Sequence, residues 1–88
     1  MKIIVYTSPG CYWCKRLRKL LKRAELNYEE RMIDDSLQCD TIELVQKYPE
    51  ANSFPFVIIE GKGVGGLGLT ARKLLSLGVI SKETLTDI

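Results

Sequence analysis

The spacing of apolar and polar positions predicts a strand followed by a helix at the start of the chain. Lys2–Tyr6 is rich in β-branched and aromatic residues and stops at a Thr-Ser-Pro-Gly loop, as a buried strand does. From Cys11 onward the apolar residues recur every three or four positions, which predicts a helix with one buried face. The residues of that face are Cys14, Leu17, Leu20, Leu21 and Ala24.

The middle of the chain predicts a second strand and a second helix. Asn27–Ile33 alternates like a strand, and its apolar members are Tyr28, Met32 and Ile33. Asp40-Thr41-Ile42-Glu43 resembles a capping box, so a helix is expected to begin there and to end before Pro49. Its expected buried side consists of Ile42, Val45 and Tyr48.

A hairpin and a last helix are expected in the C-terminal half. Phe56–Glu60 is the clearest strand, and Gly61-Lys62-Gly63 turns it into a short partner strand around Val64. The last helix runs from about Leu69 to Leu77, with Gly78 just past its end.

The predicted order is β-α-β-α-β-β-α within one domain, residues 1–88. The first β-α-β unit needs a right-handed crossover and parallel strands, whereas the hairpin adds antiparallel ones. The fold class is therefore α/β, with a four-stranded mixed sheet and helices on both faces.

Composition and charge exclude several classes of protein. With 45% hydrophobic and 27% charged residues, the chain is typical of a globular domain. It has no apolar run near the roughly 20 residues that a bilayer requires, and its start does not resemble a secretory signal. We therefore expect a cytoplasmic protein without a membrane partner. A monomer is also expected. Residues 1–24 carry seven Lys/Arg and no Asp/Glu. A solvated helix face beside an anion-attracting active site explains the basic helix Lys15–Arg23, so no nucleic-acid partner is expected.

The three cysteines indicate redox chemistry rather than a metal site. The chain has no histidine, and Cys39 is the only soft ligand besides Cys11 and Cys14, whereas structural zinc takes four ligands. No bound metal is expected, and Cys39 is interpreted as a bystander. A Cys-x-x-Cys pair at a strand-to-helix junction is typical of thiol–disulfide exchange. The alternative is two structural cysteines that happen to lie close together.

The position of each cysteine predicts its role. Cys11 precedes the helix, where free backbone N–H groups favour a thiolate, and Lys15 and Arg16 add positive charge. Cys11 is therefore the expected nucleophile. Cys14 lies one turn later on the buried face and would resolve the mixed disulfide.

Three segments resemble the glutaredoxin family. Tyr6-Thr7-Ser8-Pro9-Gly10-Cys11-Tyr12-Trp13-Cys14 is similar to the family's active-site segment, Ser53-Phe54-Pro55 to its Thr-Val-Pro segment, and Gly65-Gly66 to its double glycine. The resemblance covers roughly residues 2–78 and implies a thioredoxin fold. It also implies a cis bond before Pro55; the alternative is a trans proline that opens the strand.

The resemblance implies glutathione as co-substrate and disulfide-containing proteins, ribonucleotide reductase among them, as partners. The glutathione-binding residues that it implies are Tyr12, Phe54, Pro55, Gly65, Gly66 and Leu67. The alternative for the glycine turn is a hairpin exit without a ligand. Two other functions stay open: an iron–sulfur cluster carrier, and a thioredoxin-like donor served by a flavoprotein reductase.

The chain departs from the family pattern at three places. Tyr12 and Trp13 replace the usual Pro-Tyr between the cysteines, and Ser8 stands where many relatives have a base. The acid that commonly follows the double glycine is missing, and Thr70 is the expected substitute. These changes predict weaker binding of glutathione.

Overall fold

The computed structural model describes residues 1–33, 44–49, 51 and 53–86. The strands are β1 (Ile3–Thr7), β2 (Glu29–Met32), β3 (Phe56–Ile59) and β4 (Lys62–Gly65). The helices are α1 (Tyr12–Arg23), α3 (Leu67–Ser76) and a short 3₁₀ helix, η1 (Lys82–Leu85); residues 44–47 are also helical. Within the described ranges, no helix is long and apolar enough to cross a membrane.

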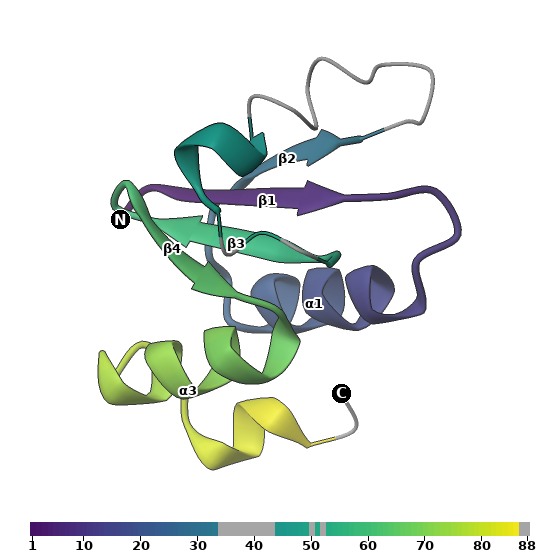
Figure 1. Cartoon of the computed structure of the whole chain (residues 1–88). Coiled ribbons are helices and arrows are strands. Elements are labelled where there is room, and N and C mark those ends of the chain that lie inside the picture. Colours follow the sequence, from purple (N-terminus) through teal and green to yellow (C-terminus); the bar gives the residue numbers. More distant parts are fainter. Residues whose placement is uncertain (34–43, 50, 52, 87–88) are drawn as a thin grey trace.

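The four strands form one mixed sheet in the order β2-β1-β3-β4. β1 and β2 are parallel, with Ile4 opposite Glu29, whereas β3 is antiparallel to both β1 and β4. α1 and α3 lie on one side of this sheet and the helical residues 44–47 on the other (Figure 1). The predicted α/β architecture of the thioredoxin type, with helices on both faces, is confirmed.

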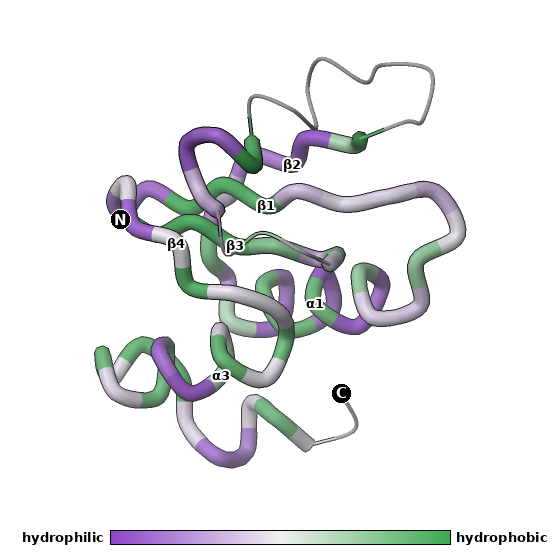
Figure 2. The backbone as a smooth tube through the Cα atoms, viewed as in Figure 1, coloured by the Kyte–Doolittle hydropathy of each residue, from purple (hydrophilic) through white to green (hydrophobic). Residues whose placement is uncertain are grey.

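Alternation along β1 and β3 divides the core between the two faces of the sheet. One face packs against α1 and α3. The fully buried residues of this cluster include Val5 from β1, Leu17 from α1 and Leu74 from α3. The other face carries Phe56 and Ile58, which contact Leu44. Figure 2 shows hydrophobic colour along β3 and the first part of β1, and alternating colour along α1. The predicted stripe of α1 is confirmed, because Cys14, Leu17, Leu20 and Leu21 are all fully buried.

Several local features differ from the pattern of the sequence. Met32, an apolar member of the second strand, is 50% exposed, and β2 lies at the edge of the sheet that the described residues form. Val45 is exposed and Leu44 is buried in its place, so the second helix presents a different face. The hairpin turns at Glu60 and Gly61, both with positive φ, since Lys62 and Gly63 are already paired with β3. The predicted capping box and Cys39 lie outside the described residues.

The C-terminal helix also begins earlier than predicted. α3 starts at Leu67, directly after the N-cap Gly66, whereas its predicted start was Leu69. Its end agrees with the prediction, because Gly78 follows the last turn with a φ of 73°. The early start brings the first backbone N–H groups of α3 next to the double glycine.

Candidate active site

The loop between β1 and α1 places the two cysteines at the helix start. Cys11 is the N-cap residue of α1, and its sulfur accepts a hydrogen bond from the backbone N–H of Cys14 at 3.1 Å. The Cys11 sulfur therefore caps the helix N-terminus, a role that a Ser or Asp side-chain oxygen usually has. The Cα atoms of the two cysteines are 5.2 Å apart, and their sulfurs are joined in a disulfide.

The two cysteines differ in exposure, and that difference assigns their roles. Cys14 is completely buried, whereas Cys11 is partly exposed. A bulky disulfide substrate can therefore approach Cys11 alone. The first turn of α1 contains no acidic residue, so the helix N-terminus and its N–H groups act unopposed on a Cys11 thiolate. The geometry supports Cys11 as the attacking cysteine and Cys14 as the resolving one.

A groove with a volume of about 410 Å³ lies at Trp13, the residue directly before Cys14 in α1. It is lined by Trp13 from α1, by the loop before β3, and by the start of α3; the lining residues are Trp13, Ser53, Phe54, Pro55, Gly66, Leu67 and Gly68. The Phe54–Pro55 bond is cis, as predicted. A Cβ atom on Gly66 would lie 3.5 Å from the carbonyl oxygen of Pro55, so these two loops are in contact.

The groove contains some of the predicted glutathione-binding residues and not others. Phe54, Pro55, Gly66 and Leu67 line it together, whereas Tyr12 and Gly65 do not. Trp13 lines it and was not among the predicted residues. The helical phase of α1 could have indicated Trp13, because it lies one turn before the buried Leu17 and two turns before the buried Leu20.

The start of α3 offers hydrogen-bond donors to this groove. The N-cap Gly66 has no side chain, so no side-chain cap occupies the first N–H groups of the helix. Such a helix start favours a carboxylate. Thr70 cannot replace the missing acid, because it is fully buried in the second turn and faces the core with Leu74. That expectation was wrong.

The two basic residues after Cys14 take different positions. Lys15 is exposed, whereas the guanidinium of Arg16 lies over the rings of both Tyr12 and Trp13, at 5.6 and 5.3 Å from their centroids. Both add positive charge to the first turns of α1. The sequence predicted this charge but not the stacking of Arg16.

Comparison with known proteins identifies the family. The Glutaredoxin family profile matches residues 3–64, about two thirds of the chain. The chain belongs to the glutaredoxin family. Like other glutaredoxins, it is a thiol–disulfide oxidoreductase with a Cys-x-x-Cys pair.

Individual glutaredoxins agree with this assignment. Glutaredoxin 1 from Rickettsia bellii is 33% identical over 66 residues, which cover 73% of this chain and 67% of that protein. The solution structure of glutaredoxin from Brucella melitensis is 30% identical, with a TM-score of 0.62 over 90% of this chain and 88% of that one. A buckwheat glutaredoxin–glutathione complex shares the fold, with 22% identity and a TM-score of 0.73 over 97% and 76% of the two chains. The chain spans 46% to 67% of the length of the sequence relatives it matches.

The pair supports two-electron exchange in two steps. The Cys11 thiolate attacks one sulfur of a substrate disulfide, forms a mixed disulfide and releases the other sulfur as a thiolate. The Cys14 thiolate then attacks Cys11, which releases the second substrate thiolate and closes the Cys11–Cys14 disulfide. The substrate gains two electrons, and the glutaredoxin is oxidised until a reductant restores both thiols.

A partly buried network behind the active-site loop was not predicted from the sequence. Arg18 donates two hydrogen bonds to the carboxylate of Glu30, at 2.7 and 2.8 Å, and the buried Thr7 hydroxyl donates a third at 3.1 Å. The hydrogen bonds from Arg18, supported by Thr7, hold the pKa of the Glu30 carboxyl below its usual value. Because Thr7 ends β1, this network ties the beginning of the active-site loop to α1 and β2.

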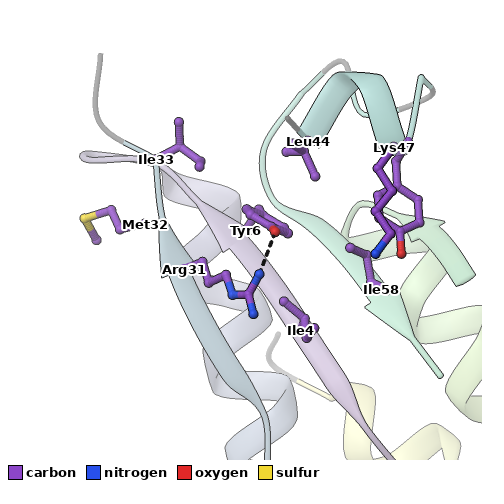
Figure 3. Close-up of a pocket in the computed structure, with 9 residues that line it drawn as sticks. Ile4, Tyr6, Arg31, Met32, Ile33, Leu44, Lys47 and Ile58 are labelled. Carbon is purple, nitrogen blue, oxygen red and sulfur yellow. Dashed lines mark hydrogen bonds between the residues drawn. The ribbon is translucent and has the colours of Figure 1, made fainter. Parts of the chain in front are cut away.

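A second cavity, of about 370 Å³, lies on the opposite face of the sheet (Figure 3). Ile4 and Ile58 line its apolar part, and Arg31 donates a hydrogen bond to the Tyr6 hydroxyl at 3.0 Å. Tyr6 therefore belongs to this face and not to the groove at Trp13. The groove at α1, by contrast, includes Trp13, which lies between the two cysteines in the sequence, so it is the cavity associated with the thiol chemistry.

Proposed function

We propose that the chain reduces protein disulfides and glutathione-mixed disulfides, and that glutathione restores its dithiol. The single observation that carries this proposal is the groove at Trp13, between the two cysteines in the sequence, in which the Phe54–Pro55 loop and the start of α3 lie together. A tripeptide bound there would have backbone groups of an extended loop on one side and helix N–H groups on the other. The glutathione complex of the buckwheat relative supports the same ligand.

Each part of the groove has a role in this proposal. The N–H groups at Gly66 and Leu67 would hold a carboxylate of glutathione, since the start of α3 has no side-chain cap. Trp13 and Pro55 would cover its aliphatic part. The glutathione sulfur would then lie toward Cys11, where the covalent bond forms.

Protein disulfides reach the same cysteine, because Cys11 is the exposed member of the pair. We propose a cytoplasmic, monomeric electron donor, with ribonucleotide reductase among its protein substrates, as the family resemblance implies. The cytoplasm suits this role because its reducing poise keeps both thiols available.

The missing acid after the double glycine provides the test. Gly68 is exposed in the first turn of α3, and a Cβ atom there would meet no other atom within 4 Å. An acid at this position could pair with the glutathione amine. We expect Gly68→Asp to lower the KM for glutathione about two- to tenfold. This range corresponds to one charge-assisted hydrogen bond at an exposed or half-buried position.

The assay is reduction of a glutathionylated peptide, coupled to glutathione reductase, over a range of glutathione concentrations. Gly68→Asn is the matched control, because it has the same size without the charge, and it should leave the KM near that of the wild type. Absence of turnover at any accessible glutathione concentration, when dithiothreitol still supports exchange, would reject the glutathione linkage. An unchanged KM in Gly68→Asp would reject the proposed position of the ligand.

A further inference from the structure

Three side chains beside Cys11 form one exposed aromatic and cationic patch. Tyr12 is 61% exposed and Trp13 is 52% exposed, and their rings meet edge to face at 5.2 Å. The guanidinium of Arg16 covers both rings, and its Nη1 lies 3.4 Å from the Tyr12 hydroxyl. We call these residues the Tyr12–Trp13–Arg16 patch. Its geometry follows from the helix, since Arg16 lies one turn after both aromatic residues.

The patch lies where a polypeptide substrate has to pass. Tyr12 and Trp13 are the two residues between the cysteines, so a chain whose sulfur is bonded to Cys11 runs close over them. Exposed Tyr, Trp and Arg side chains are the types that contribute most to binding at interfaces. Arg16 donates from Nη1 to the Tyr12 hydroxyl, and a guanidinium has five N–H donors in all, so others remain that can bind a carboxylate.

The charges around the patch favour an acidic partner. The first turn of α1 has no acidic residue, and Lys15 is exposed next to Arg16. The acids of the neighbouring strand β2 are already paired, because Glu30 binds Arg18 and Glu29 binds Arg31. Within the part of the chain that the structure describes, the first turns of α1 are therefore positive, and both carboxylates of β2 are paired with arginines.

We propose that the Tyr12–Trp13–Arg16 patch selects polypeptide disulfides whose cysteine is flanked by acidic residues. The aromatic rings would contact the substrate chain, and Arg16 would bind its carboxylate. The inference rests on the proposed reduction of protein disulfides, but it does not require glutathione. Arg16 acts here as a specificity-determining residue, in addition to its positive charge near the thiolate.

The test uses three peptides that differ only at the two positions flanking one cysteine, where they carry Glu, Gln or Lys. Each peptide cysteine is joined to 2-nitro-5-thiobenzoate, a coloured leaving group. The Cys11 thiolate attacks the peptide sulfur and releases the thiobenzoate. Cys14 then displaces the peptide thiol and closes the disulfide. The pre-reduced protein reacts once, and absorbance gives the rate constant without any glutathione.

The measured quantity is the ratio of the rate constants for the Glu and Lys peptides. Changes in the reactivity of the Cys11 thiolate cancel in this ratio, so it reports selectivity alone. We expect a ratio of about ten at low ionic strength, since one exposed charge contact changes binding by up to about fivefold and the Lys peptide is repelled. The ratio should fall as salt is added.

Substitutions separate the patch from the net charge of the chain. Arg16→Gln should reduce the ratio to about two, within the range for one lost charge contact. Lys22→Gln removes the same charge from an exposed position in the last turn of α1 and should leave the ratio close to that of the wild type. Arg16→Lys should restore part of the preference.

A wild-type ratio near one, or equal losses in Arg16→Gln and Lys22→Gln, would overturn the inference. Failure of every peptide to react would instead reject the protein-disulfide activity itself.

Discussion

Loss of the Glu30 carboxylate should destabilise the fold by an amount that depends on pH. Glu30 accepts two hydrogen bonds from Arg18, and the two side chains are 26% and 32% exposed. Exposed pairs contribute about 0.2–1 kcal/mol, and breaking fully buried pairs costs about 3–5 kcal/mol. For this partly buried, bidentate pair we expect Glu30→Gln to lower the free energy of unfolding by about 1–2 kcal/mol at neutral pH.

The sign of the pH dependence follows from the lowered pKa of Glu30. A carboxyl group with a lower pKa in the folded state stabilises the protein above its unfolded pKa, which is about 4.3. That stabilisation is lost as the pH falls from there through the folded-state pKa, because both states then bind the proton. The wild type and Glu30→Gln should therefore converge in stability at acidic pH.

The assay is urea unfolding of four oxidised proteins: the wild type, Glu30→Gln, Arg18→Met and the double variant. Arg18→Met keeps most of the aliphatic stem and removes the charge. The cycle isolates the pair from other carboxyl groups, and we expect a coupling energy of about 1 kcal/mol at pH 7. A coupling energy below about 0.3 kcal/mol, or one that is the same at pH 7 and near pH 2.5, would refute the reasoning.

The remaining predictions concern the cysteines and two glycines. Cys11→Ser should abolish thiol exchange, whereas Cys14→Ser should trap mixed disulfides with proteins; faster alkylation of Cys14 than of Cys11 in the reduced protein would reverse these roles. Gly65→Ala should lower the free energy of unfolding by about 1–3 kcal/mol, because Gly65 has a φ of 128° and a Cβ would lie 2.6 Å from the Leu69 side chain. Gly68→Ala should raise it by about 0.5–1 kcal/mol, since Gly68 lies in α3 with open space around it. Urea unfolding measures both, and equal effects of the two changes would contradict the geometric argument.

Features set by local spacing could be predicted from the sequence. The buried face of α1 depends on positions three and four residues apart, so Cys14, Leu17 and Leu20 were assigned correctly. The strand-to-helix junction likewise placed Cys11 at a helix start. These features need no knowledge of distant parts of the chain.

Features set by pairing between distant segments could not be predicted. The exposure of Met32 depends on β2 lying at the edge of the sheet, and the Thr7–Glu30 hydrogen bond depends on the position of β2 beside β1. The groove was anticipated only through the resemblance of Phe54-Pro55 and Gly66 to family segments. Helical phase could have indicated Trp13, but its place opposite Pro55 and Gly66 depends on how α1 lies beside the loop before β3.

The complete burial of Cys14 should also protect the active site from permanent damage. Hydrogen peroxide oxidises a thiolate such as that of Cys11 to a sulfenic acid, and the departing hydroxide takes up a proton and leaves as water. Cys14, shielded from the same oxidant, is held at the next turn, and its attack on the sulfenic sulfur releases a second water and forms the disulfide. The reaction ends in the state from which the normal cycle is restored by a thiol, and the irreversible sulfinic step is bypassed.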